Sequence, residues 1–360
     1  MTGTMTFVGL DVHARSTQAC ALHPLSSELR RKGFGPGIEP LLAWLRALPR
    51  PVRACYEAGP TGFGLQRAAE AAGIACQVVA PSKTPRARGD RVKNDRKDAE
   101  LLCRLLVAGQ LTPVAVPGLQ VECARDLTRA REQVRADPCR GRHRVSKLLL
   151  RHGRVYPERS TWTLAHRRWL ARQCFENQNT ELAYLDALAH VDGLVARRAA
   201  LDDRLSRLAL EGEWADTVAR LRCFRGLHTL SALVLCLEVG DFHRFRRARQ
   251  LPAWLGLTPG RDQSGGSDVS GPITKTGSRY ARRILVEAAW HCGRPPHVGV
   301  TLAGRHHGQP AHVLQLAWRC QHRLYRLHQR LRERHKPPNV TTVALARELA
   351  CVLWAAAVAD

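Results

Sequence analysis

The run Thr6–Val12, T-F-V-G-L-D-V, most constrains the fold, because it is an apolar β-type segment that carries one carboxylate, Asp11. Its β-branched and aromatic residues predict a strand, and a second strand over about Thr17–Leu22 follows a short turn, which predicts a hairpin. A carboxylate within a strand faces either the core or a site. Since an unpaired buried carboxylate is expensive, metal binding explains Asp11 better than simple burial does.

The following segments predict helices and strands in alternation. Helices are expected over Pro40–Leu48 and Leu65–Ala72, and strands over Val52–Tyr56 and Ile74–Val79. Glu57 follows the first of these strands. The glycine-rich A-G-P-T-G-F-G-L after it matches neither the P-loop nor the G-x-G-x-x-G pattern, so we interpret it as a strand-to-helix turn.

The stretch Gly89–Glu100, G-D-R-V-K-N-D-R-K-D-A-E, opens a predicted helix on which Asp95 and Asp98 lie three residues apart and share one face. Many cations surround this pair. Two carboxylates on a basic surface are suited to a divalent cation that acts beside phosphate. The alternative is a solvated helix start with acids near its positive end.

The acids occur in the order of a ribonuclease-H-like metal site: an Asp in one strand, a Glu at the end of another strand, and a pair of Asp on a helix. The motifs G-L-D-V-H, Y-E-A-G-P-T-G and K-N-D-R-K-D-A-E resemble the DEDD transposases of insertion sequences. That family includes Piv-type DNA invertases and RNA-guided bridge recombinases. The resemblance implies a RuvC-like amino-terminal domain in which Asp11, Glu57, Asp95 and Asp98 hold Mg²⁺.

The charge balance indicates a polyanionic partner. Lys and Arg total 56 against 31 Asp and Glu, a formal net charge of +25, which points to nucleic acid first and to an anionic membrane second. We expect no membrane association, because no lipidation motif or basic amphipathic anchor is present, and the apolar run Leu349–Ala359 is too short to span a bilayer. The amino-terminal residues lack the features of a signal peptide, so a cytoplasmic protein is expected.

Cysteine and histidine spacing gives no metal or disulfide pattern. The twelve Cys contain no C-x-x-C, and the sixteen His contain no H-E-x-x-H. The sequence therefore suggests neither a zinc ribbon nor a disulfide framework.

The middle of the chain predicts long helices. After a linker at Val114–Gly118, helices are expected over Val121–Arg135, Arg144–His152 and Leu182–Leu210, with a pattern that could pair them as a coiled coil. One side is rich in arginine, including Arg129, which indicates either a solvated face or an arm that binds nucleic acid or a partner. Pro138 should break the first helix, a departure from the family.

The carboxy-terminal part carries a second set of motifs. Leu221–Leu237 resembles a helix-hairpin-helix, with His228 where a second glycine is usual; an ordinary helix pair remains the alternative. Further on, S-G-G at Ser264 reads by itself as a flexible loop. The pattern G-L-T-P…S-G-G…G-x-I-T-K-x-G-x-R-x-x-R-R-x-L resembles the family's carboxy-terminal signature, which implies that Ser264 is its nucleophilic serine. A basic helix at Ala317–Leu331 and an apolar one at Val340–Val358 are expected beyond it.

The sequence thus predicts an α/β plus α protein. The expected parts are a RuvC-like metal-binding domain at 1–115, a basic helical or coiled-coil region at 116–215, a mainly helical transposase domain at 216–335 and a final helix at 336–360. The candidate nucleic-acid-binding residues are Lys83, Arg86, Arg88, Arg91, Lys93, Arg129, Lys275, Arg279, Arg282 and Arg283.

The expected function is Mg²⁺-dependent cleavage and rejoining of DNA through a phosphoserine. The resemblance further implies an element-encoded guide RNA. Because two separate domains would contribute residues to one active site, a dimer or tetramer is expected. Three alternatives remain: a junction resolvase or nuclease that uses water, a sugar-kinase-like ATPase, and a decayed copy that only binds nucleic acid. The ATPase is disfavoured because no phosphate-loop glycines lie beside Asp11.

Overall fold

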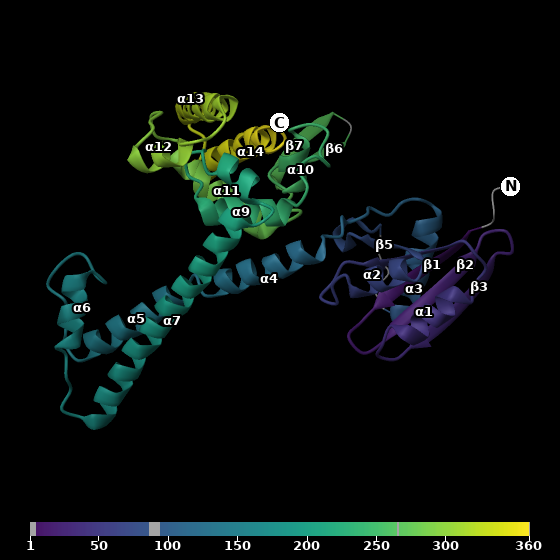
Figure 1. Cartoon of the computed structure of the whole chain (residues 1–360), viewed down its shortest axis with the longest axis horizontal. Coiled ribbons are helices and arrows are strands. Elements are labelled where there is room, and N and C mark those ends of the chain that lie inside the picture. The colour runs from purple at the N-terminus through teal and green to yellow at the C-terminus, as the bar shows by residue number, and fades with distance from the viewer. Residues whose placement is uncertain (1–4, 86–93, 265, 360) are drawn as a thin grey trace. The chain divides into compact units, whose positions relative to one another are not determined.

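The computed structural model describes residues 5–85, 94–264 and 266–359 (Figure 1). The chain divides into two compact units, Met1–Pro117 and Gly118–Asp360. The finer division predicted at 215 and 335 stays a prediction.

The first unit is a five-stranded mixed sheet with helices on both faces. Its strands are β1 (Thr6–Val12), β2 (Thr17–His23), β3 (Glu28–Phe34), β4 (Val52–Glu57) and β5 (Ala75–Val79), and its helices are α1 (Glu39–Arg46), α2 (Gly64–Ala71), the 3₁₀ turn η1 (Pro81–Lys83) and α3 (Asp95–Val107). The spatial order is β3-β2-β1-β4-β5. β1, β2 and β3 are antiparallel neighbours, whereas β4 is parallel to both β1 and β5. The predicted mixed α/β character is confirmed.

Alternation along β1 assigns a helix layer to each face of the sheet. Val8 and Leu10 are fully buried in the core that includes residues of α1 and α2. Phe7 and Gly9 lie on the opposite face, beneath α3. A Cβ atom at Gly9 would lie 2.1 Å from the carbonyl oxygen of Ala99, so only glycine allows α3 this close to β1.

Strand β3, E-L-R-R-K-G-F, is an edge strand that the sequence did not predict. It pairs with β2 along its whole length, and most of its side chains are exposed. Charged residues are usual on a sheet edge because they discourage pairing with other chains. The same charges hide the apolar alternation by which a strand is recognised.

The second unit is mostly helical. It contains α4 (Leu119–Gln133), α5 (Asp137–Arg151), α6 (Leu164–Ala171), α7 (Gln178–Glu211), α8 (Ala215–Leu221), α9 (Thr229–Val239), α10 (Gln250–Trp254), β6 (Pro259–Ser264), β7 (Ser267–Ile273), α11 (Arg279–His291), α12 (Val300–His306), α13 (Ala311–Glu333) and α14 (Pro338–Ala357). One large core joins the end of α7 to α8, α9, α11, α13 and α14, and α4 contributes Ala124 to it.

Helix α5 lies along α7, and α6 caps the pair (Figure 1). Val145 and Leu149 of α5 pack with Leu170 of α6 and with Tyr184 and Val191 of α7. The predicted long helices are therefore present, while supercoiled pairing stays a prediction. The break predicted at Pro138 is confirmed: α4 ends at Gln133, and α5 restarts at Asp137 with this proline in its first turn, where proline costs no hydrogen bond.

Helix α14 qualifies by length and composition as a membrane-spanning segment, because it has 20 residues and contains an 18-residue stretch with a mean hydropathy of 1.5. The expectation that the apolar end of the chain is too short to span a bilayer was wrong on length, since it considered only 349–359. Half of the helix is buried within the protein. Leu345, Leu349 and Leu353 lie in the main core, so the predicted packing of this helix on its domain is confirmed.

Candidate active site

Two carboxylates meet at one edge of the first unit's sheet. β1 and β4 are parallel, and Leu10 lies opposite Tyr56, so Asp11 and Glu57 are the next residues along each strand. Because Gly9 and Cys55 face α3, the two-residue period directs both acids to this same side.

Helix α3 brings the second pair of acids to the same edge. The Asn94 side chain caps the helix by accepting a hydrogen bond from the Arg96 backbone N–H at 3.0 Å. Asp95 and Asp98 fall in the first turn, where the helix dipole favours negative charge.

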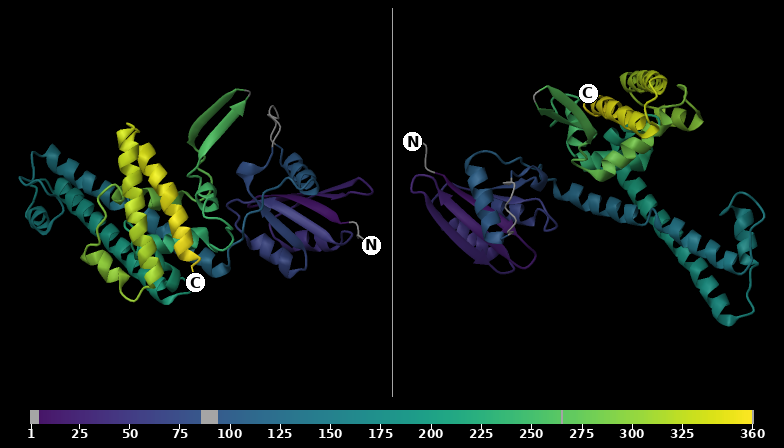
Figure 2. Two further views of the ribbon diagram at one scale, coloured as in Figure 1. Left: turned by 90° about the horizontal axis from the view of Figure 1, so that it is seen from above. Right: turned by 180° about the vertical axis from the view of Figure 1, so that it is seen from behind.

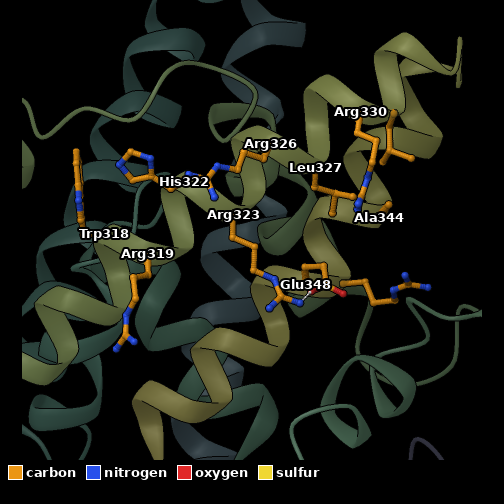
Figure 3. Close-up of a pocket in the computed structure, with 11 residues that line it drawn as sticks. Trp318, Arg319, His322, Arg323, Arg326, Leu327, Arg330, Ala344 and Glu348 are labelled. Atoms are coloured by element: carbon orange, nitrogen blue, oxygen red, sulfur yellow. Dashed lines mark hydrogen bonds and ion pairs between the residues drawn. The ribbon is translucent and has the colours of Figure 1, made fainter.

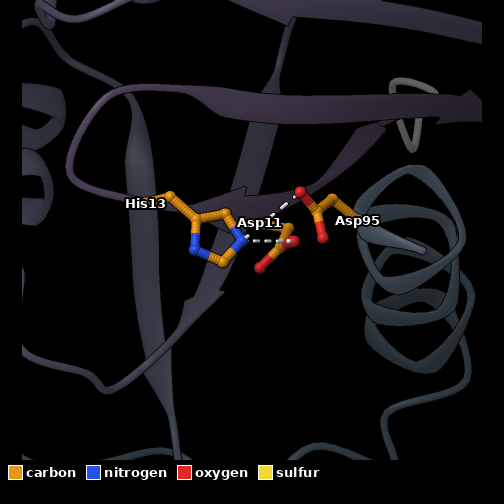
Figure 4. Close-up of side chains that lie close together, drawn as sticks. All are labelled: Asp11, His13 and Asp95. Carbon is orange, nitrogen blue, oxygen red and sulfur yellow. Dashed lines mark hydrogen bonds and ion pairs between the residues drawn. The ribbon is translucent and has the colours of Figure 1, made fainter. Parts of the chain in front are cut away.

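An imidazole links acids from the two elements (Figure 4). His13 Nε2 lies 3.1 Å from Asp11 Oδ2 and 3.7 Å from Asp95 Oδ2. Ligand atoms of these three residues all lie within 4.8 Å of one another, an arrangement that can hold a metal ion. Sequence reasoning missed His13 as a site residue. The available signal was its position two residues after Asp11 in G-L-D-V-H, which puts it on the same side of the chain.

A pocket of about 760 Å³ opens at this edge. Asp11, His13, Glu57 and Asp98 line it together with the glycine-rich turn after β4. Three of the four predicted acids therefore face one pocket, and the fourth, Asp95, approaches Asp11 within 4.8 Å. The four acids therefore lie near one edge of the sheet, and their metal-binding and catalytic roles stay a prediction.

Burial raises the pKa of Asp11. Its side chain is 20% exposed, and loss of solvation is the main cause of the rise, with Asp95 and Asp98 adding repulsion; His13 opposes both through its charge and its hydrogen bond. The ionised Asp11 carboxylate is thus held where its negative charge is unfavourable, as expected where a cation is to be bound.

Ser264 is the last residue of β6. It pairs in register with Ser267, the first residue of β7, and the two strands are antiparallel. Strands β6 and β7 were not predicted from the sequence, because these polar strands lack the apolar alternation of a half-buried strand. The Ser264 side chain lies outside what the structure describes.

Several predicted nucleic-acid-binding cations have other partners. Arg282 Nη1 donates to the carbonyl oxygens of Leu255 at 3.0 Å and Gly277 at 3.3 Å, and also to that of Thr276. Burial lowers the pKa of this arginine. These contacts hold the base of the β6–β7 hairpin, and the phosphate-binding role of Arg282 stays a prediction.

Arg283 and Arg129 also form internal ion pairs. Arg283 binds Glu132 and Glu287, at 2.6 and 2.7 Å. Arg129 lies 3.5 Å from buried Glu238 and is itself 44% exposed. These contacts reduce the charge that either residue can offer to nucleic acid.

The remaining cations divide into exposed and undescribed residues. Lys83, Lys275 and Arg279 are exposed. Arg86, Arg88, Arg91 and Lys93 lie outside the described residues. The phosphate-binding role of each stays a prediction.

Comparison with known proteins identifies the family. A profile described as the transposase IS116/IS110/IS902 family matches residues 218–297, and the DEDD transposase profile of the IS110 type matches residues 8–153. The y4qE protein of Sinorhizobium fredii, which is named as a transposase, is 37% identical over 98% of this chain and 88% of its own length. The chain belongs to this transposase family. The transposase for insertion sequence element IS1533 of Leptospira borgpetersenii is also similar, at 31% identity over 92% of this chain and 97% of its own length.

The resemblance to DEDD transposases is thus confirmed, and the protein is a DNA-recombining enzyme of an insertion sequence. The DEDD profile contains all four acids together with His13, whereas the second profile contains Ser264 and the cations that follow it. Neither profile reaches α6, α7, α12, α13 or α14.

Proposed function

We propose that this transposase cuts and rejoins DNA through a phosphoserine intermediate in a Mg²⁺-dependent reaction. Asp11, Glu57, Asp95 and Asp98 hold the metal, and Ser264 is the nucleophile. The observation that carries the proposal is the convergence of acids from β1, β4 and the start of α3 on one pocket edge.

The topology of the first unit supports a RuvC-like assignment. The sheet order β3-β2-β1-β4-β5, with the two strand acids at the ends of parallel β1 and β4, is the arrangement that the resemblance implies. Asp95 and Asp98 in the first turn of helix α3 are the second pair of acids.

The donor set fits a hard divalent cation. Four carboxylates offer only oxygen ligands, which Mg²⁺ prefers, and burial raises the pKa of Asp11, so its charge is unfavourable without a cation. Mg²⁺ supplies Lewis acidity toward a phosphoryl oxygen and relieves negative charge there. His13 orients the Asp11 and Asp95 carboxylates through its two contacts.

The chemical step exchanges one phosphodiester for another. The Ser264 hydroxyl attacks phosphorus, the bond from phosphorus to the 3′ oxygen breaks, and the serine proton is transferred overall to that oxygen. The products are a serine–DNA phosphodiester and a free 3′ hydroxyl. Attack by a 3′ hydroxyl on this linkage reverses the step, so rejoining needs no ATP.

The same proposal includes the partners. The transposase binds an element-encoded guide RNA besides DNA, acts in the cytoplasm and assembles as a dimer or tetramer in which the acids and the serine meet on DNA. The guide RNA comes from the family resemblance, the cytoplasmic location from the lack of signal-peptide features, and the oligomer from two domains that contribute to one site.

The deciding experiment concerns Ser264. We expect Ser264→Ala to lose strand cleavage and recombination together while it still binds Mg²⁺. Ser267→Ala and Ser270→Ala, which remove neighbouring hydroxyls, are the matched controls and should retain both activities. Wild-type protein quenched in denaturant should yield DNA joined to a Ser264 peptide, detectable by mass spectrometry.

The resolvase alternative makes the opposite prediction. If water is the nucleophile, Ser264→Ala cleaves DNA normally and the wild type forms no adduct, while Asp98→Asn still abolishes cleavage. If the chain is a decayed copy, the wild type binds DNA but does not cut it at any Mg²⁺ concentration. Glu70→Gln, an exposed acid on α2, is the control for loss of one negative charge.

A further inference from the structure

A basic groove lies between α13 and α14 in the second unit, and none of its lining residues has been given a catalytic role. Figure 2 shows these helices side by side. The groove has a volume of about 860 Å³, and residues of both helices line it (Figure 3).

Arginines form a row along the groove. Arg319, Arg323, Arg326 and Arg330 follow one another at spacings of four, three and four residues, so they share one face of α13. All four are exposed, and Arg347 of α14 adds a fifth guanidinium to the lining.

Little negative charge balances this row. Glu348 is the only acid in the lining, and it pairs with Arg323 at 2.5 Å. Within the described part of the chain, no carboxylate forms an ion pair with Arg319, Arg326 or Arg330. The groove is therefore a surface of unbalanced positive charge that fits a row of phosphates.

Trp318 adds an aromatic surface at one end of the row. Its side chain is 44% exposed. The His322 ring packs edge-on against it, with ring centroids 4.6 Å apart and an interplanar angle of 78°. This contact orients the indole and leaves ring surface open to solvent.

We propose that this groove binds a single-stranded segment of DNA, with a base stacked on Trp318 and the backbone phosphates on the arginines of α13. Arginines beside an open aromatic ring match the needs of a single strand, whose bases are free to stack. Bases in a duplex already stack on one another and present only their edges in the grooves, so they cannot stack on Trp318. DNA is the polyanion chosen because the family acts on DNA.

Two variants of the full chain test the proposal by fluorescence anisotropy with a labelled oligothymidylate. Trp318→Leu should weaken binding by about 5-fold or more, the loss expected from one stacked base, while Trp318→Phe should retain most of the affinity. Trp290→Leu on α11, where the replaced tryptophan is 52% exposed, is the matched control and should bind as the wild type does.

The second variant removes charge. Arg319→Gln combined with Arg326→Gln should lower the slope of log affinity against log salt by about 1.4, or about 0.7 per lost phosphate contact. Arg46→Gln with Arg50→Gln removes two exposed charges of the first unit and is the control. Because all four arginines are exposed, this test stands even if a tryptophan variant fails to fold.

Other outcomes would overturn the proposal. One is that a blunt DNA duplex competes as well as oligothymidylate and that its binding falls equally in the Trp318 variant. Another is that only an oligouridylate loses affinity in the variants, which would make the groove an RNA site. Equal losses of affinity in the paired controls would show that the effect is not specific to the groove.

Discussion

Replacing Asp11 by Asn tests whether this carboxylate is held for a cation. An ordinary structural Asp is stabilised by its surroundings, so neutralising it costs free energy. Asp11 is the reverse case, because burial and the neighbouring acids raise its pKa. With a folded pKa above the unfolded one, its contribution to stability falls as pH rises through that interval, and at neutral pH the full cost of the charge is present.

The magnitude follows from the geometry. Carboxylate oxygens of Asp11 and Asp95 lie within 4.8 Å of each other. Two unit charges at about that distance repel by about 3.5 kcal/mol at an effective dielectric constant of 20 and by about 0.9 kcal/mol in water. Because Asp95 is 50% exposed and His13 offsets part of the charge, the lower value applies. Asp11→Asn should therefore leave the metal-free protein equally stable or stabilise it by up to about 1 kcal/mol.

With metal the sign reverses. Mg²⁺ at 100 times its dissociation constant should raise the free energy of unfolding of the wild type by about 2.7 kcal/mol, and Asp11→Asn should lose most of this increase. Since the chain has two units, hydrogen exchange of β1 and α3 peptides during denaturant unfolding is the suitable readout, because it isolates the first unit.

Glu70→Gln is the control for a change of one charge in a chain of +25. It should keep the full Mg²⁺ effect. The reasoning fails if Asp11→Asn destabilises the metal-free unit by more than 1 kcal/mol relative to this control, or if it responds to Mg²⁺ as the wild type does.

Three further predictions concern packing and charge. Gly9→Ala should destabilise the first unit by about 3 kcal/mol in urea unfolding, because its Cβ would meet the α3 backbone, whereas Gly35→Ala has open space and should be nearly neutral. Arg282→Lys keeps the charge but loses the shared contacts to carbonyl oxygens, so it should lower stability by about 1–3 kcal/mol and leave the salt dependence of DNA binding unchanged. DNA affinity of the wild type should fall by about 10³ or more over a few-fold rise in salt, and a flat response would contradict the electrostatic interpretation.

The edge that carries the four acids was predictable because it depends on short-range rules. The strand around Asp11 and the strand before Glu57 are apolar runs, and helical spacing alone joins Asp95 to Asp98. Parallel pairing of β1 with β4 then brings strand ends together. His13 obeys the same two-residue period, but a lone histidine after a strand carries no chemistry until its neighbours are known.

Residues whose neighbours are distant in sequence were not predictable in the same way. Arg282 has the spacing and charge of a phosphate contact, yet its guanidinium reaches the carbonyl oxygen of Leu255, 27 residues away. Arg125 of α4 likewise donates to the carbonyl oxygen of Leu237 at 2.7 Å. Composition counts such charges as available, whereas the fold uses them to satisfy buried carbonyl groups.

In the loop before α9, a glycine that could suggest DNA binding is likewise required by the fold. The resemblance to a helix-hairpin-helix suggests that Gly226 opens backbone N–H groups to phosphate. In the fold its φ is +85°, and a Cβ there would lie 2.6 Å from the carbonyl oxygen of Ala288 on α11. Both the backbone angle and this close approach require glycine whether or not DNA binds. The glycine therefore gives no support to a phosphate-binding hairpin, and the row of arginines on α13, whose charge is not balanced by neighbouring acids, is the better-supported DNA contact in this unit.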